Sequence, residues 1–281
     1  MKWLVNIFIS IFAFAIAYGI AFLTGISTVQ YAVLIAFFIH WIAFIPAYIF
    51  QTEKFYDLTG SLTYLSVLWF TYISSQDLYG DNIGNLVLVL FISIWAIRLG
   101  SFLFMRIHKD GEDKRFRTIK PSASQFFMTW TLSGLWVSLC SMCALTAISS
   151  STGVVFNLTT YIGIGLFVIG FGIEVIADHQ KTVFRSFEEN KNKFITTGLW
   201  SKSRHPNYFG EILLWSAIAI ISFSSLQGSQ YLTLISPIFT YLLLVYVSGV
   251  RMLESMSDKK WGDIKEYQEY KKKTPMLFLK F

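Results

Sequence analysis

Residues 3–23 have the sequence WLVNIFISIFAFAIAYGIAFL, without a single charged side chain. The hydrocarbon core of a bilayer is about 30 Å thick, and a helix needs about 20 apolar residues to cross it. Seven further stretches have a similar character. We therefore expect eight membrane-spanning helices, at residues 3–23, 29–50, 58–74, 83–104, 126–147, 154–176, 212–223 and 231–250.

The overall composition agrees with this interpretation. Charged residues make up only 14% of the chain, whereas a soluble domain carries roughly a quarter, and the mean hydropathy is +0.53. The third stretch is interrupted by Thr and Tyr, so a count of seven also stays open, and Pro237 is expected to kink the eighth helix. We predict an all-α fold, a polytopic membrane bundle of about 7–8 transmembrane helices with cytoplasmic loops that form a cofactor site.

The distribution of basic residues supports the count of eight. The segments between the first and second, third and fourth, fifth and sixth, and seventh and eighth stretches contain no Lys or Arg. With eight spans every other loop is basic, and the positive-inside rule places these loops and both termini in the cytoplasm. Membrane topology thus accounts for the net charge of +6, and we expect no nucleic-acid partner. We expect an integral protein of the bacterial inner membrane whose basic tail contacts anionic lipids.

The chain is predicted to have two parts. Residues 1–50 form an N-terminal pair of transmembrane helices, and residues 51–281 form a membrane catalytic domain, because the polar motifs begin at residue 51. No spacing typical of a zinc site is present, and we expect no metal. No obligate protein partner is evident.

Several charged residues lie within or at the ends of the predicted spans, where they are costly unless they are paired or face a wet cavity. They include Asp57, Arg98, Glu174 and Asp178. Glu174 and Asp178 are four residues apart and share one helix face, and Arg185 follows two turns later. These charges either form interhelical pairs that fix the bundle, or line a polar cavity that holds an anionic ligand.

A basic face follows the fourth predicted span. Arg98, Phe102, Met105, Arg106 and Lys109 are spaced three or four residues apart, so that a continuing helix would present them on one side. Such a face could direct cations at phosphates. The alternative is a juxtamembrane basic cluster that only sets the topology.

The loop before the seventh predicted span carries the most informative motif, GLWSKSRHPNYFGE at residues 198–211. Arg204 and His205 can bind phosphate, while Asn207 and Tyr208 can hydrogen-bond to amides and hydroxyls. The helix that begins at the proline of this motif adds positive potential toward an anion. The chain has no glycine-rich dinucleotide loop after a strand, so the helix bundle itself would have to hold any nucleotide.

With SRHPNYFGE at 203–211, the sequence resembles the DUF1295 group of membrane proteins, which are similar to the C-terminal domain of steroid 5α-reductases. The resemblance includes RLG at 98–100, GEDKRF at 111–116, GFGIEVIAD at 170–178 and separate positions between 248 and 275, and covers roughly residues 50–281. It implies a helix bundle that binds NADPH in a polar cavity facing the cytoplasm. A hydrophobic lipid substrate would enter from the bilayer.

The resemblance and the motifs together assign site residues. Asp57 is the best match for the acid near the substrate carbonyl, with Glu53 and Tyr56 as further catalytic candidates. The reductases pair their acid with a Tyr on the next helix, where this chain has Trp95, so Tyr56 or Tyr64 would have to substitute. The expected cofactor contacts are Arg98, Arg106, Lys109, Glu174, Asp178, Arg185, Arg204, His205, Asn207, Tyr208, Glu211 and Arg251.

Three functions are compatible with these motifs. In the reductase, hydride adds to the β-carbon of an enone in a steroid-like or isoprenoid lipid while protonated Asp57 polarises the carbonyl oxygen. The second is an S-adenosylmethionine-dependent methyltransferase similar to the isoprenylcysteine carboxyl methyltransferases, which share the Arg-His-Pro-x-Tyr-x-Gly pattern. The third is a lipid-binding or scaffolding bundle without enzymatic activity.

Overall fold

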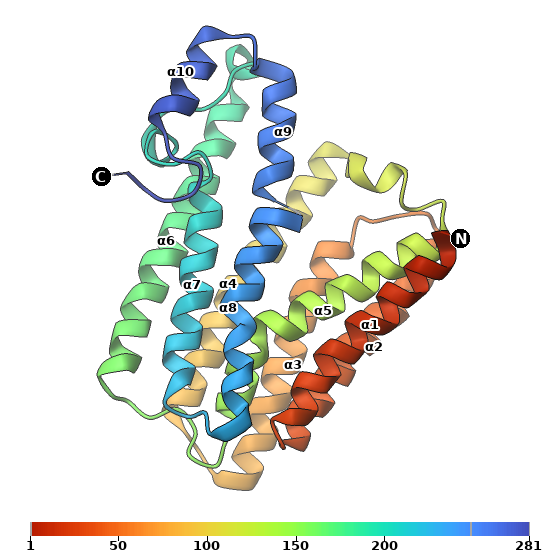
Figure 1. Cartoon of the computed structure of the whole chain (residues 1–281), viewed down its shortest axis with the longest axis vertical. Coiled ribbons are helices and arrows are strands. Elements are labelled where there is room, and N and C mark those ends of the chain that lie inside the picture. The colour runs from red at the N-terminus through yellow and green to blue at the C-terminus, as the bar shows by residue number, and fades with distance from the viewer. Residues whose placement is uncertain (1, 248, 281) are drawn as a thin grey trace. The chain divides into compact units, whose positions relative to one another are not determined.

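The computed structural model describes residues 2–247 and 249–280, and every regular element among them is a helix (Figure 1). The seven long helices are α1 (Lys2–Leu23), α2 (Ser27–Ile49), α3 (Tyr56–Tyr79), α4 (Ile83–Asp110), α5 (Ala123–Ile148), α6 (Leu158–Ser186) and α7 (Pro206–Phe223). Three shorter helices follow, α8 (Ile235–Leu242), α9 (Val250–Trp261) and α10 (Lys265–Lys273). Short 3₁₀ or π segments are η1 (Lys114–Arg117), η2 (Glu188–Asn190), η3 (Gly198–Ser201), η4 (Gly228–Leu234) and η5 (Leu243–Val247).

Seven segments among the described residues are long and apolar enough to cross a membrane: α1, α2, α4, α5, α6, α7 and the stretch Gly228–Trp261. This pattern is that of a multi-pass membrane protein and confirms the predicted all-α helix bundle. Helix α3 has 24 residues, enough to span, but it is too polar to count with the other seven. The cytoplasmic position of both termini stays a prediction.

The main differences from the predicted spans concern α6 and the last span. Helix α6 continues to Ser186, ten residues beyond the expected end, because the helix persists as an amphipathic segment after the apolar run stops. We expected a kink at Pro237, but the last span is not interrupted there. Pro237 lies in the first turn of α8, where its missing N–H has no helical acceptor to lose, and the chain leaves α geometry at the π segment η5.

By internal contacts the chain divides into two compact units, residues 1–160 with 221–236 and residues 161–220 with 237–281. In the first unit, α5 packs against α1, α2 and α3, and every one of its residues from Val137 to Ile148 is buried. The division does not follow the predicted boundary at residue 50, since α2 packs against α3 and α5. The domain assignment itself stays a prediction.

In the second unit, two glycines bring α6 and α7 together. A Cβ placed on Gly170 would lie 2.8 Å from the carbonyl oxygen of Gly210, and a Cβ on Gly210 would lie 2.6 Å from that of Gly170. Only glycine permits this approach of two backbones. We call this contact the α6–α7 seam; it holds the buried carboxylates at the end of α6 beside the first turn of α7.

Candidate functional site

In the first unit, Glu53 ties together the loops that precede α3 and follow α4. Its side chain is buried, its Oε1 accepts a hydrogen bond from the backbone N–H of Asp113 at 2.8 Å, and its Oε2 forms an ion pair with Lys120. A buried carboxylate needs such partners. Glu53 thus fixes the loop around η1, and a role for it as a catalytic acid stays a prediction.

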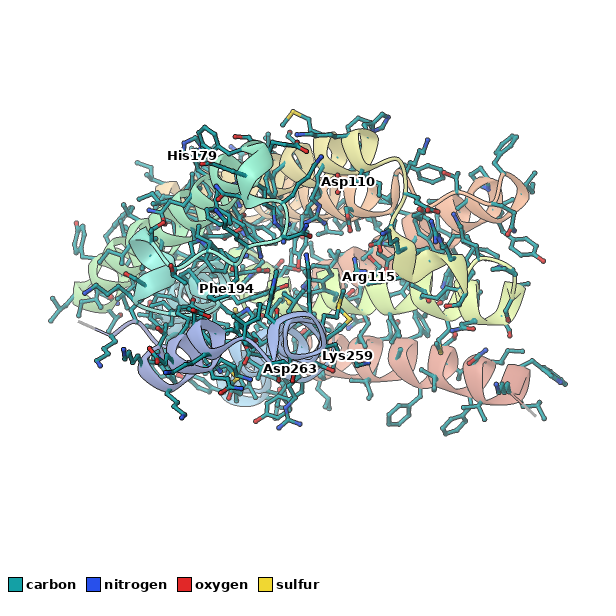
Figure 2. All side chains as sticks on the ribbon, turned by 90° about the horizontal axis from the view of Figure 1, so that it is seen from above. Asp110, Arg115, His179, Phe194, Lys259 and Asp263 are labelled. Carbon is teal, nitrogen blue, oxygen red and sulfur yellow. The ribbon has the colours of Figure 1, made fainter. Side chains whose placement is uncertain are left out.

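Asp57 lies in the first turn of α3 and is half-buried. Burial raises the pKa of its carboxyl group above the ordinary value, while Arg106 and Arg115 act in the opposite direction. Arg115, labelled in Figure 2, is held by Asp113, whose Oδ2 accepts from its Nε at 2.9 Å. The net effect of these surroundings is a raised pKa, although two cations lie near the carboxyl group.

The tyrosine candidates differ in what their side chains contact. The Tyr56 hydroxyl donates to the carbonyl oxygen of Thr129 at 3.0 Å, so its proton points at the backbone of α5. Tyr64 is buried, and its ring meets Trp95 edge-on with a centroid distance of 5.2 Å. Tyr64 of α3 therefore lies against Trp95 of α4.

The basic face of α4 forms as the spacing predicts, because α4 continues to Asp110. The guanidinium carbons of Arg98 and Arg106 lie 5.3 and 6.0 Å from the ring centroid of Phe102. Arg106 and Lys109 are exposed, and within the described part of the chain neither makes an ion pair. These two cations keep their hydrogen-bond donors open to solvent or a ligand.

In the second unit, Arg204 holds the C-terminal segment, an arrangement we call the Arg204 latch. Its guanidinium donates to both carboxylate oxygens of Glu254, at 3.2 and 2.7 Å, and to the carbonyl oxygens of Lys271 and Thr274, at 2.9 and 3.1 Å. His205 Nε2 lies 2.9 Å from the same carboxylate. Of the five N–H groups of an Arg side chain, this latch occupies four.

The extended tail after α10 completes the latch. The backbone N–H of Arg204 donates to the carbonyl oxygen of Pro275, and that of Lys280 donates to Lys202, each at 2.9 Å. Between them Leu277 is buried in a small core with Val245 and Val250 of the second unit. The Arg-His-Pro motif therefore fixes the tail; contacts of Arg204 and His205 with a cofactor stay predictions.

A hydrogen bond joins Asn207 of α7 to Asp178 of α6 beside the α6–α7 seam. Asn207 Nδ2 donates to Asp178 Oδ1 at 3.1 Å, while the Asn207 Oδ1 atom is buried and accepts no hydrogen bond from the described residues. Glu174 and Glu211 are buried nearby, at 2% and 7% exposure. The Asn207 Oδ1 atom can therefore accept a hydrogen bond from a donor outside the described residues.

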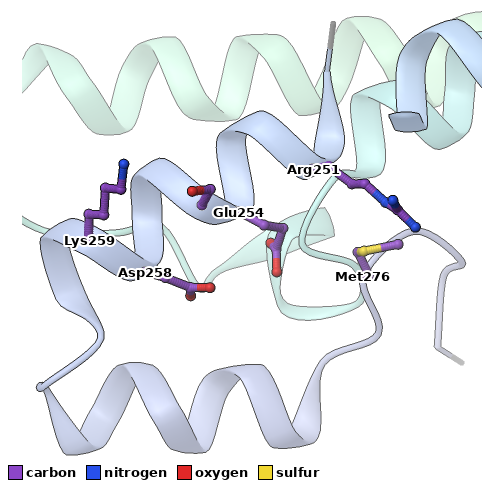
Figure 3. A pocket seen from close by; sticks show the side chains of 6 residues that line it. Arg251, Glu254, Asp258, Lys259 and Met276 are labelled. Atoms are coloured by element: carbon purple, nitrogen blue, oxygen red, sulfur yellow. The ribbon is translucent and has the colours of Figure 1, made fainter. Parts of the chain in front are cut away.

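The remaining candidates lie apart from the seam. Tyr208 packs in the small core around Val245, and Arg185 is exposed near the end of α6. Arg251 stacks on the ring of Tyr246 at 4.1 Å and lines a groove of about 660 Å³ along α9. Figure 3 shows Arg251 and Met276 at one end of this groove and Asp258 and Lys259 at the other.

Lys120 and Glu254 are structural partners that the sequence patterns do not predict. Each is the partner of a residue about 50 or more positions away, and nothing in the spacing of charges along the chain indicates such a pair. Among the described residues no group of His, Cys, Asp and Glu could hold a metal ion.

Comparison with known proteins adds three findings. A probable O-methyltransferase, ustE of Ustilaginoidea virens, is 32% identical over 114 residues, 35% of this chain and 40% of that protein. An uncharacterised protein of Schizosaccharomyces pombe, C594.04c, is 25% identical over 222 residues, 68% of this chain and 63% of that protein. The chain thus spans less than two thirds of either relative, and no solved structure matches it.

The family assignment rests on a longer match. The model of the family described as a protein of unknown function, DUF1295, matches residues 41–274. This range includes Asp57, the basic face of α4, the α6–α7 seam and the Arg204 latch. The chain belongs to the DUF1295 family.

Proposed function

We propose that this protein is a membrane-embedded reductase that uses NADPH to reduce an activated C=C bond in a hydrophobic lipid. The observation that carries the proposal is the half-buried Asp57, whose pKa is raised by burial. A carboxyl group that keeps its proton can donate to the oxygen of an enone, which an ionised aspartate cannot do. Raised carboxyl pKa values are typical of acids with a catalytic task.

The side chains present are compatible with a nicotinamide nucleotide. The buried Asn207 Oδ1 atom lacks a donor among the described residues, and a carboxamide NH₂ would supply one. In the first unit, considered by itself, Arg106 and Lys109 are exposed cations of the kind that bind phosphate, whereas Arg204 is engaged by its latch. When bound, NADPH supplies the hydride, and the side chains bind and orient the reactants.

Asp57 carries the proton in this proposal. As the β-carbon of the enone gains the hydride, the carbonyl electrons move onto oxygen, and the Asp57 proton is transferred to that oxygen. The resulting enol returns to the ketone by taking up a proton from water at the α-carbon, while its O–H proton goes back to the Asp57 carboxylate. Tyr64, packed against Trp95, is the second candidate for a donor to the same oxygen.

The test is NADPH consumption by purified protein in lipid nanodiscs, with enone lipids as substrates. Asp57→Asn should lower turnover by about 100-fold and leave NADPH affinity within about twofold, because only the proton donor is lost. Asp110→Asn, an exposed carboxylate at the end of α4, is the matched control and should change neither. Equal losses of turnover and affinity in Asp57→Asn would contradict the assignment.

A second candidate is a methyltransferase that uses S-adenosylmethionine. The specific support is the relative named as a probable O-methyltransferase. The buried carboxylates of the α6–α7 seam would also suit a sulfonium cation. This alternative predicts transfer of a labelled methyl group to a lipid acceptor and no consumption of NADPH with enone lipids.

A further inference from the structure

A second groove lies beside the last turns of α6, away from the α6–α7 seam. It has a volume of about 360 Å³, and we call it the α6 groove. One wall is the end of α6 and the other is the chain between Asn190 and Gly198. The lining residues are His179, Gln180, Val183, Phe184, Phe187, Asn190, Thr197 and Gly198.

The groove continues an apolar stripe on α6. Ile162, Ile169, Ile176 and Val183 follow at intervals of seven residues and are 49%, 55%, 51% and 42% exposed. Seven residues are about two helical turns, so these side chains lie on one face. Within a membrane span, such an exposed apolar face meets lipid chains.

The length of α6 places the groove at the level of the lipid headgroups. The helix has 29 residues and is therefore about 43 Å long. This exceeds the hydrocarbon core of about 30 Å and matches the 40–45 Å of a bilayer with its headgroups. Val183 lies in the last turns of α6 and Phe187 directly after its end, beyond what the hydrocarbon core can cover if the helix enters the membrane near its first residues.

The two walls of the α6 groove are held in place by contacts within the protein. Gln180 Oε1 accepts from the backbone N–H of Leu199 at 2.9 Å, and Asn190 Nδ2 donates to the carbonyl oxygen of Phe184 at 3.0 Å. Gly198 has a φ of +61°, and a Cβ there would come within 2.6 Å of the Gln180 side chain. Hydrogen bonds from both walls and a required glycine therefore set the shape of the groove.

The polar atoms of the groove belong to imidazole, amide and hydroxyl groups. Its lining contains no Lys, Arg, Asp or Glu. His179, labelled on α6 in Figure 2, is exposed, and no hydrogen bond of its ring is found among the described residues. Imidazole, amide and hydroxyl groups pair with a hydroxyl or a carbonyl, whereas a phosphate would call for cations.

We propose that the α6 groove binds the polar end of an uncharged lipid, a long-chain alcohol or ketone, whose chain runs along Ile176 and Val183. His179 hydrogen-bonds to its oxygen, and Phe187 covers the adjoining carbons. The site does not depend on the proposed reductase activity. If both hold, the groove concentrates neutral carbonyl lipids at the protein surface.

The test is photolabelling of the purified protein in nanodiscs with a diazirine-bearing long-chain alcohol, followed by peptide mapping. We expect labels between residues 179 and 198 that an excess of the unlabelled alcohol removes and phosphatidylglycerol does not. His179→Ala should reduce this labelling about fivefold, the loss of about one hydrogen bond. Ile169→Ala, on the same stripe but outside the groove, should leave it unchanged.

Labels spread evenly along the stripe from Ile162, or equal competition by phosphatidylglycerol, would overturn the proposal. Because His179 is exposed, its substitution should not unfold the protein, and unchanged thermal stability confirms this. Measuring NADPH binding on the same variant separates the two proposals. If His179→Ala loses labelling but still binds NADPH, the result bears on the α6 groove alone. If the unmodified protein does not bind NADPH, the result bears on the reductase proposal alone.

Discussion

Arg204 in the second unit and Arg106 in the first are both arginines in polar motifs near membrane spans, yet their surroundings differ. The Arg204 guanidinium makes four hydrogen bonds to the chain, and its side chain is 13% exposed. Arg106 is exposed and stacks on Phe102 at 6.0 Å. The Arg-His-Pro motif, which the sequence suggests as a binding site, thus mainly fixes the C-terminal tail. The basic face of α4 keeps hydrogen-bond donors that a ligand can use.

Removing the Arg204 side chain should release the C-terminal tail. Arg204→Ala should cost about 3 kcal/mol of unfolding free energy, because it leaves the carboxylate of Glu254 half-buried beside fewer partners. Thermal unfolding in detergent and trypsin cleavage after the exposed Lys272 would both report the loss. Arg251→Ala, which removes an exposed arginine, is the control. Equal destabilisation by the two substitutions would contradict a latch specific to Arg204.

A smaller loss is expected at Glu53, the first unit's counterpart of the latch. Glu53→Ala leaves the N–H of Asp113 and the ammonium of Lys120 without their acceptor, at a cost of about 2 kcal/mol. Glu53→Gln keeps an acceptor for Asp113 and should lose less. Thermal unfolding measures both variants. If Glu53 instead acted only as a catalytic acid, turnover would fall without a change in stability.

The pH dependence of turnover tests the influence of Arg106 on Asp57. The pKa of Asp57 is raised by burial and lowered by Arg106, and activity requires the protonated carboxyl group. Turnover should therefore fall as pH rises through the raised pKa of Asp57. Arg106→Gln removes a cation that favours the ionised form, so this limb should move to higher pH. Lys109→Gln should leave this limb in place; an unchanged limb or a shift to lower pH in Arg106→Gln would contradict an influence of Arg106 on the pKa of Asp57.

The smallest expected effect concerns His205. Burial lowers its pKa below the ordinary 6.5, although Glu254 opposes the shift. The unfolded chain then binds a proton on His205 at a higher pH than the folded chain does, so the folded state loses stability as pH falls below about 6.5. His205→Gln, which keeps a donor toward Glu254, should flatten this loss. The unfolding free energy of both proteins is measured between pH 7.5 and 5.5. The same dependence on pH in both would contradict this prediction.

Sequence patterns predict the helices and which residues share a helix face. The apolar runs predict the long helices, and the spacing of Arg98, Phe102 and Arg106 predicts one face of α4, because both depend on local geometry. The patterns do not predict contacts between distant segments: the partner of Arg204 is 50 residues away, at Glu254. They also do not predict the end of α6, since its last ten residues are polar on one side and stay helical through contacts with the following loop.

The most direct test of the proposed function is cofactor binding to the detergent-purified protein, measured by thermal shift with NADPH and with S-adenosylmethionine. We expect NADPH to stabilise the protein, and Asn207→Ala to weaken that binding about tenfold, because the buried amide would no longer meet the carboxamide. Asn192→Ala, at an exposed position, should bind as the unmodified protein does. Stabilisation by S-adenosylmethionine alone would contradict the reductase and establish the methyltransferase in its place.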